Sequence, residues 1–194
     1  LIASAQKKLD LSNRRITISS CGVVPGIEKL GNDFPQISLA ISLHAPNDEA
    51  RKKIMPVDHT YPIDTLMKAL DEYVTKTNKR IFYEYIMIAG VTDRIEYAHE
   101  LAKLLKNRLA HVNFIPYNPG EGIMGNNYQP TSKIIMKKFQ KTLEEHGIPS
   151  TIRHTMGDDI DAACGQLALK EEGKSLATKE GKSMKSLVEK HWKK

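Results

Sequence analysis

Two cysteines carry the thiols of this 194-residue chain, and their number and spacing limit the chemistry that they can do. Cys21 and Cys164 lie far apart, and no C-x-x-C pair or close cluster of cysteine and histidine accompanies them. A self-contained metal site needs several such ligands at short spacing. Two cysteines are also too few for a disulfide framework. The sequence therefore predicts no metal ligand within this chain.

A second set of polar residues stands at the ends of expected β-strands. Ser19 and Ser20 end the first strand, Ser42 and His44 end the second, and Asn118 follows the fourth. In α/β proteins, ligands bind beyond the carboxyl ends of the strands. Hydroxyl, amide and imidazole groups can direct hydrogen bonds to such a ligand. We therefore expect these residues to line one pocket, although a cap or a turn is the simpler explanation for each of them alone.

Runs rich in β-branched and aromatic residues predict the strands that position these groups. They are residues 15–20, 36–43, 80–88 and 111–115, with a weaker run at 150–153. Amphipathic helical patterns follow at residues 63–75, 93–105 and 131–146, and residues 1–11 resemble a helix before the first strand. Apolar strands that alternate with helices predict an α/β fold with a mostly parallel sheet. Fewer strands are visible than a complete barrel needs, so a doubly wound sheet and a partial barrel are both open.

The positive charge is concentrated at one end of the chain. The whole sequence has a net charge of +6 and a sequence pI near 9.2. Residues 170–194 hold eight lysines against four glutamates, which is +4 of that total. We expect residues 1–169 to form the folded body of the chain, and residues 170–194 to be a flexible basic tail. This tail can contact phosphates or can simply be a solvated terminus.

The sequence gives no sign of a membrane protein. No apolar run approaches the roughly 20 residues of a membrane-spanning helix. Residues 1–10 also lack the apolar stretch behind a basic start that marks a signal peptide. A cytoplasmic protein without a membrane partner is therefore expected.

Four motifs carry a resemblance to a known family. They are RRITISSCGVVP at residues 14–25, LAISLHAPN at 39–47, NFIPYNP at 113–119 and GDDIDAACGQL at 157–167. In this order and spacing they resemble the radical-SAM methyltransferases that methylate carbon 2 of adenine in ribosomal RNA. The resemblance extends from residue 1 to about residue 167. It implies that residues 1–169 are the C-terminal portion of a radical-SAM catalytic domain, with the later strands of a partial (βα)6 barrel.

The resemblance also implies cofactors and partners. These are S-adenosylmethionine, a [4Fe–4S] cluster, 23S ribosomal RNA with transfer RNA as a further substrate, and an electron donor, for a monomeric enzyme. In this family the cluster ligands lie in a C-x-x-x-C-x-x-C loop upstream, and a Gly-Glu motif meets S-adenosylmethionine. The C-x-x-x-C-x-x-C loop does not occur in this chain, and the resemblance places the Gly-Glu motif in the same upstream part of the family's sequence. The chain alone is therefore expected to be inactive.

Residue roles follow from positions within the motifs. Cys164 corresponds to the cysteine that carries the methyl group as an S-methylcysteine intermediate. Carbon 2 of adenine is electron-poor and does not attack a sulfonium methyl group, so the family uses a radical route. The residues that correspond to contacts with S-adenosylmethionine are Ser19, Ser42, Leu43, His44 and Asn118.

The residues alone do not make Cys164 reactive. Asp158, Asp159 and Asp161 oppose ionisation of its thiol. Without the resemblance, a buried and inert thiol is the better interpretation, because free cysteines are often buried. Cys21 falls where relatives carry serine or threonine, and we interpret it as structural.

Glu84 is a lone carboxylate in an apolar strand. A buried carboxylate needs a partner, so Glu84 either contacts a polar ligand or pairs with an arginine. Arg153 is a candidate for that pair, and it can alternatively hold an RNA phosphate through a bidentate contact.

Two alternatives compete with the carbon-2 enzyme. The closer one is the related family that methylates carbon 8 of adenine, which shares the motif around Cys164. The other is a non-catalytic RNA-binding module, which the basic tail permits and the nearly neutral body does not favour.

Overall fold

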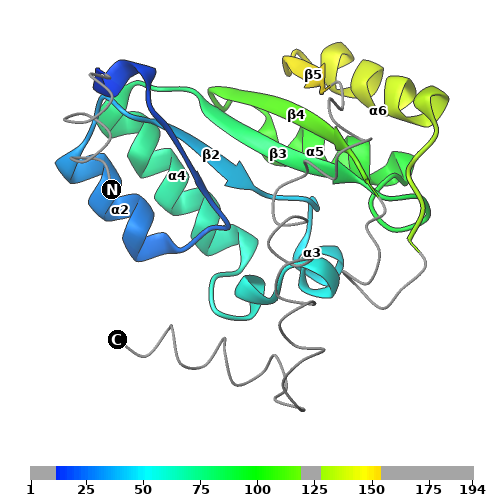
Figure 1. The fold of residues 1–194 in the computed structure, drawn as a ribbon, viewed down its shortest axis with the longest axis horizontal. Helices are drawn as coiled ribbons and strands as arrows, with labels where there is room; N and C mark the ends of the chain where they lie inside the picture. Colours follow the sequence, from blue (N-terminus) through cyan, green and yellow to red (C-terminus); the bar gives the residue numbers. More distant parts are fainter. Residues whose placement is uncertain (1–11, 119–127, 154–194) are drawn as a thin grey trace, which may run out of the picture. The chain divides into compact units, whose positions relative to one another are not determined.

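The computed structural model describes residues 12–118 and 128–153, and these contain a five-stranded parallel sheet (Figure 1). The strands are hydrogen-bonded in the order β1, β2, β3, β4, β5, so each lies beside its neighbour in the sequence. Their bounds are β1 (Thr17–Ser20), β2 (Ser38–Ser42), β3 (Ile81–Met87), β4 (Ala110–Pro116) and β5 (Ser150–Ile152). All five expected strands occur, and the predicted α/β class with a parallel sheet is confirmed.

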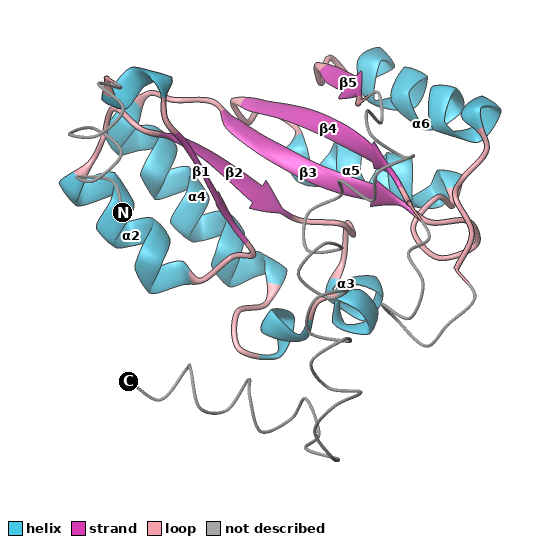
Figure 2. Ribbon diagram, in the orientation of Figure 1, coloured by secondary structure: helices cyan, strands magenta, loops and turns pink. Residues whose placement is uncertain are grey.

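Helices occupy every connection between consecutive strands (Figure 2). Their bounds are α2 (Val24–Asp33), α3 (Asp48–Ile54), α4 (Ile63–Thr77), α5 (Ile95–Leu105) and α6 (Lys133–Glu145), with short 3-10 helices η1 (Asn13–Arg15) and η2 (Pro56–His59). Side chains of α2, α4, α5 and α6 share one hydrophobic core with alternate residues of the strands. A doubly wound sheet would reverse its strand order and cover both faces. The consecutive order instead agrees with the partial-barrel alternative.

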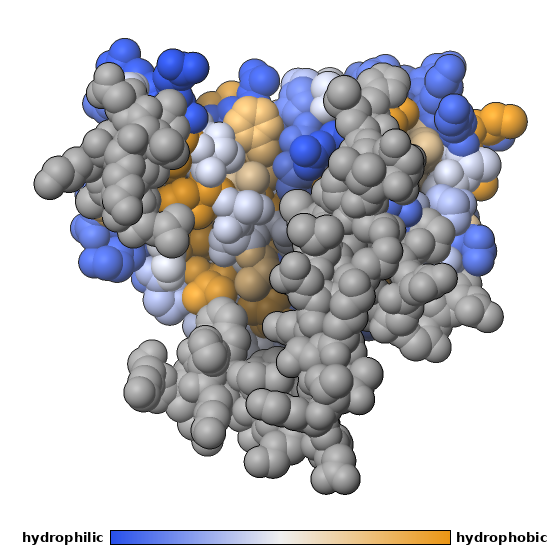
Figure 3. All heavy atoms as spheres, in the orientation of Figure 1, coloured by the Kyte–Doolittle hydropathy of each residue, from blue (hydrophilic) through white to orange (hydrophobic). Residues whose placement is uncertain are grey.

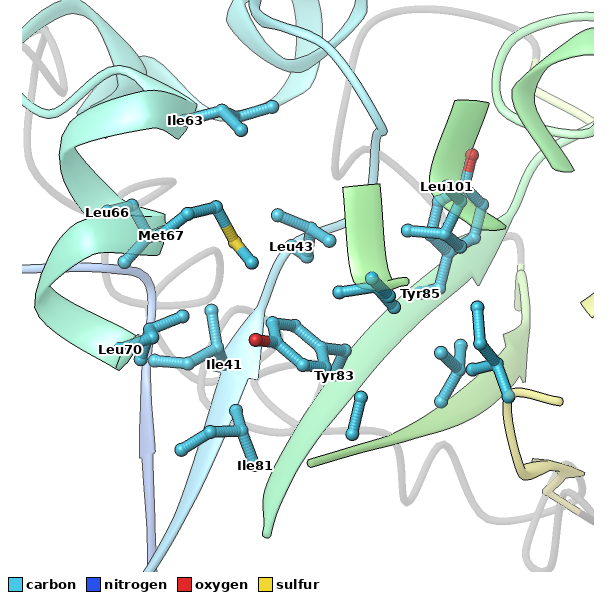
Figure 4. Close-up of a cluster of buried hydrophobic side chains, with 14 of the residues drawn as sticks. Ile41, Leu43, Ile63, Leu66, Met67, Leu70, Ile81, Tyr83, Tyr85 and Leu101 are labelled. Carbon is cyan, nitrogen blue, oxygen red and sulfur yellow. The ribbon is translucent and has the colours of Figure 1, made fainter. Parts of the chain in front are cut away.

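Strand β3 shows how the sheet divides its two faces. Its alternate residues Ile81, Tyr83, Tyr85 and Met87 are fully buried in the core, and Figure 4 shows three of them with apolar residues of β2 and α4. The intervening Phe82, Glu84 and Ile86 are half-buried and point to the opposite face, because side chains alternate along a strand. We call this opposite face the inner face. The strand register adds to it Ser19, Ser42, His111, Asn113 and Thr151.

Two helices, α2 and α3, escaped prediction for identifiable reasons. Helix α2 contains Gly26 and Gly31, and glycine lowers the helix propensity of a segment. A Cβ atom at Gly31 would lie 3.1 Å from Cδ2 of Tyr73, so packing against α4 favours glycine there. Helix α3 has seven residues, too few for a clear apolar period. In α2, the close packing that favours glycine therefore also weakens the helical pattern in the sequence.

Some expectations fall outside the described residues. These are the helix at residues 1–11, the motif that contains Cys164 and the basic tail, so the proposed boundary at residue 169 stays a prediction. Within residues 12–118 and 128–153, no helix is both long enough and apolar enough to span a bilayer.

Candidate functional site

Ser19 and Ser42 lie on the inner face of neighbouring strands. Ser19 is exposed and pairs in register with Ala40, two residues before Ser42 on β2. Ser42 is half-buried and is the last residue of its strand. Ser20 points the other way, and its hydroxyl accepts the N–H of Gly22 at 3.1 Å. The structure therefore brings Ser19 and Ser42 to one face, while Ser20 caps the end of β1.

The chain turns sharply after Ser42. His44 has a φ of 61°, in the left-handed region that few residues other than glycine and asparagine adopt readily. The N–H groups of Leu43 and His44 both donate to the carbonyl oxygen of Glu84, at 3.1 and 3.2 Å. The side chain of Leu43 is fully buried in the core. The side chain of Leu43 therefore belongs to the core, and its N–H and carbonyl groups already bond to Glu84 and Arg51.

The imidazole of His44 is fixed in one neutral form. The N–H of Ile86 donates to Nδ1 of His44 at 3.2 Å, so the ring proton belongs on Nε2. Burial, together with the positive charge of Arg51, lowers the pKa of His44 to about 4. At neutral pH the ring is uncharged and its Nε2–H is a hydrogen-bond donor. His44 is therefore suited to binding a polar ligand rather than to holding an anion by charge.

Arg51 is a site residue that the sequence did not reveal. It is fully buried, and its guanidinium donates to the carbonyl oxygens of Leu43 (3.1 Å), Cys21 (2.8 Å) and Ser42 (3.3 Å). A fourth contact joins its Nη1 to Oδ1 of Asp58 at 2.9 Å. Arg51 thus binds the ends of β1 and β2 together. No sequence pattern separates Arg51 from the exposed lysines that follow it in the same helix.

Glu84 forms the ion pair that the sequence suggested. Its Oε2 lies 3.8 Å from Nη1 of Arg153, and its Oε1 accepts a hydrogen bond from Nδ2 of Asn113 at 3.0 Å. Thr151 extends this network, because its hydroxyl donates to Oδ1 of Asn113 at 2.7 Å. The pairing of Glu84 with Arg153 is confirmed. The register places Ser42, Glu84, Asn113 and Thr151 side by side across four strands, and we call these four residues the inner row.

The surroundings of Ser19 are largely apolar. Ser19 borders a groove of about 340 Å³ beside β1, whose other walls include Ile18, Val23, Leu30 and Phe34, so the groove lies toward α2 rather than over the inner face. Figure 3 shows apolar residues in a band on the visible face, bordered by hydrophilic ones. Apolar walls with a few directed polar groups are typical of sites for small organic ligands.

Two of the expected residues are not joined to this group. Asn118 follows the end of β4 by two residues and belongs to a separate compact unit of the chain, so its contact with a cofactor stays a prediction. Cys164 lies outside the described residues. Within residues 12–118 and 128–153, Cys21 is the one cysteine, and no group of three or more His, Cys, Asp or Glu side chains is placed to hold a metal ion.

No protein-family model matches the chain. It is 48% identical over 169 residues to the probable dual-specificity RNA methyltransferase RlmN of Alkaliphilus metalliredigens, covering 87% of this chain and 47% of that protein. For the protein of the same name from Bacillus licheniformis, the identity is 45% over 170 residues, with coverage of 88% and 46%. The chain spans about half the length of the curated relatives it matches.

Solved structures give a consistent result. A radical SAM methyltransferase from Sphaerobacter thermophilus is 43% identical, with a TM-score of 0.77, over 81% of this chain and 46% of that chain. A domain of pyruvate-formate lyase-activating enzyme from Bacteroides vulgatus is 14% identical with a TM-score of 0.55, over 71% of this chain and 80% of that chain, which shows the fold alone. The resemblance of the chain to radical-SAM RNA methyltransferases is thereby confirmed.

Proposed function

We propose that this chain is the C-terminal part of the catalytic domain of a radical-SAM RNA methyltransferase that methylates carbon 2 of adenine. Its substrates are 23S ribosomal RNA and transfer RNA, and it works as a cytoplasmic monomer through an S-methylcysteine intermediate on Cys164. The observation that carries the proposal is the 44–48% identity, over most of this chain, to relatives named as RNA methyltransferases. The 43% identity to a radical SAM methyltransferase structure supports the same reaction class.

The radical-SAM relatives imply S-adenosylmethionine and a [4Fe–4S] cluster as cofactors. The polar groups of the inner face fit the first of these. Ser19 and Ser42 present hydroxyls, and His44 presents an uncharged N–H donor, which suits hydroxyl and carboxylate groups of a nucleoside ligand. We assign S-adenosylmethionine to Ser19, Ser42, Leu43, His44 and Asn118. The cluster ligands belong to sequence outside this chain, since clusters of this kind are held by closely spaced cysteines.

Within this reaction, the bound cofactors supply the methyl group and the radical chemistry. The chain's own residues orient the cofactor and carry the methyl group. Ser42 and His44 hold the nucleoside at the end of β2, and Arg51 keeps that strand end in place from behind. The thiolate of Cys164 would attack the methyl carbon of the sulfonium group and become a thioether, with S-adenosylhomocysteine as the leaving group, and that methyl carbon would later be transferred to the base. His44 can bind the nucleoside in its neutral form, because a hydrogen bond from its N–H requires no positive charge.

The test uses the longer protein that contains this chain, reconstituted anaerobically with iron and sulfide. It is incubated with S-adenosylmethionine that carries a labelled methyl group and with a 23S ribosomal RNA fragment, and the nucleosides are analysed by mass spectrometry. Labelled 2-methyladenosine is expected, while 8-methyladenosine would identify the carbon-8 relative instead. Cys164→Ala should abolish the product, and Cys21→Ala is the matched control that should retain it. Full activity of Cys164→Ala would overturn the assigned role.

A further inference from the structure

Glu84 lies where two sets of contacts meet on β3. Its carbonyl oxygen accepts the N–H groups of Leu43 and His44 on the β2 side. Its carboxylate accepts a hydrogen bond from Asn113 of β4 and pairs with Arg153, which follows β5. The backbone of Glu84 thus holds the segment assigned to the cofactor, and its side chain holds the far edge of the sheet.

The contact with Arg153 spans a whole strand. Strand β5 pairs with β4 alone, so the guanidinium of Arg153 crosses β4 on the inner face to reach Glu84 on β3. Strand β5 has three residues, two of them half-buried, and therefore little apolar packing of its own. Its position depends on ladder hydrogen bonds and on polar side-chain contacts, which include the Thr151–Asn113 bond at 2.7 Å.

A largely buried carboxylate at this position costs free energy. The side chain of Glu84 is 14% exposed, and that of Arg153 is 62% exposed. Among the described residues, Oε2 of Glu84 is buried and accepts no hydrogen bond, because the 3.8 Å separation from Arg153 is longer than a hydrogen bond. An apolar residue would satisfy the strand at lower free-energy cost. The side chain is therefore better explained by what it positions than by what it contributes to folding.

We propose that Glu84 is a positioning residue that couples the cofactor-contact segment, residues 42–44, to strand β5 and Arg153. This inference rests on the proposed function, because the chain continues from Arg153 to Cys164 eleven residues later. Through the two ends of Glu84, a displacement of the segment that holds S-adenosylmethionine is transmitted to the strand that precedes the methyl carrier. Loss of the carboxylate charge should release β5 and leave the apolar core unchanged, since Glu84 points away from that core.

The first experiment measures amide hydrogen exchange in this 194-residue chain. The amide of Arg153 donates to the carbonyl of Phe114 at 2.9 Å and reports on the end of β5. Glu84→Gln keeps the size of the side chain and an acceptor for Asn113 but removes the charge that attracts Arg153. Exchange at Arg153 should rise by about 2- to 5-fold, as expected for a partly exposed ion pair. In the Arg153→Gln background, Glu84→Gln should add no further change.

The matched control is a second arginine–carboxylate pair on another part of the fold. Arg108 contacts both carboxylate oxygens of Asp71 at 2.9 Å. Asp71→Asn removes a charge of the same kind and should leave exchange at Arg153 unchanged. If Glu84→Gln has no effect at Arg153, or if Asp71→Asn has the same effect, the coupling through Glu84 is wrong.

The second experiment uses the longer enzyme and separates positioning from general damage. With Glu84→Gln, the KM for S-adenosylmethionine should stay within about twofold, while the rate of methyl transfer to Cys164, followed by mass spectrometry of the peptide, should fall by about 10-fold. If the KM for S-adenosylmethionine rises by the same factor as the rate of methyl transfer falls, the role of Glu84 is merely structural and the proposal is overturned. If the unchanged enzyme never methylates Cys164, the proposed function fails instead, and the exchange experiment still decides whether Glu84 couples the two segments.

Discussion

Each of two arginine–carboxylate pairs includes a residue that bonds to the backbone of residues 42–44, and the two pairs differ in burial. Arg51 and Asp58 are fully buried, and Arg51 holds the carbonyl oxygens of that segment. Glu84 and Arg153 lie on the inner face, with the arginine largely exposed, and the backbone of Glu84 holds the N–H groups of the same segment. The comparison indicates that the buried pair holds the segment away from solvent, whereas solvent reaches the other pair and can weaken it.

The largest expected effect comes from removing the buried pair. Arg51→Ala leaves the carboxylate of Asp58 buried without its cation, and it leaves three strand-end carbonyls without a donor. The free energy of unfolding should fall by about 3–5 kcal/mol. Urea denaturation of the chain measures this change. Lys52→Ala, at the adjacent exposed position, should change it by less than about 0.5 kcal/mol, and an equal effect of both would contradict the role of Arg51.

The next effect concerns pH. Burial beside Arg51 depresses the pKa of His44 from 6.5 to about 4, so between these values the unfolded chain binds a proton that the folded chain does not. Stability from this group is complete above pH 6.5 and is lost as the pH falls toward 4, by about 2–3 kcal/mol. His44→Asn removes the titration, and asparagine tolerates the positive φ. The variant should therefore lose less stability than the original chain over this range; an NMR titration of His44 near 6.5 would refute the expectation.

A smaller effect tests the backbone beside Arg51. Gly22 has a φ of +104°, and a Cβ atom there would lie 3.2 Å from Leu66 and 3.3 Å from Nη2 of Arg51. Gly22→Ala should lower the free energy of unfolding by about 1–3 kcal/mol, from backbone strain and from the displaced guanidinium. Gly147→Ala is the control, because Gly147 also has a positive φ but has no atom within 4 Å of an added Cβ. Thermal denaturation of both variants separates the crowding from the strain.

The contrast between the pairs also shows why the sequence predicted some features of the structure and missed others. Strands were predictable because their core-facing residues, such as Ile81 and Tyr83, are apolar and β-forming whatever they pack against. Arg51 was missed because its burial depends on carbonyls up to 30 residues away, which no local pattern encodes. The pairing of Glu84 with Arg153 was proposed from the isolation of one carboxylate in an apolar strand.

The inner row shows a further limit of prediction from the sequence. Its members Asn113 and Thr151 are ordinary polar residues in the sequence, and only the register of β3, β4 and β5 brings them to Glu84. Ser42 and His44 were selected through a family motif, since their side chains alone fit a strand end equally well. Local composition therefore predicts the elements, whereas contacts across strands require the register.

The smallest effect should come from the exposed pair, and it completes the comparison. Glu84→Gln should lower the free energy of unfolding by less than about 1 kcal/mol, because Arg153 is 62% exposed and solvent screens the pair. Salt distinguishes the two pairs further. Raising the ionic strength to about 1 M shortens the screening length to about 3 Å, which weakens attraction between charges that solvent reaches and has little effect on buried ones. The difference in stability between the original chain and Glu84→Gln should therefore shrink toward zero in salt, while the difference for Arg51→Ala persists. Urea titrations at low and high salt measure both, and an undiminished effect of Glu84→Gln in salt would show that its pair with Arg153 is as well shielded as the buried one.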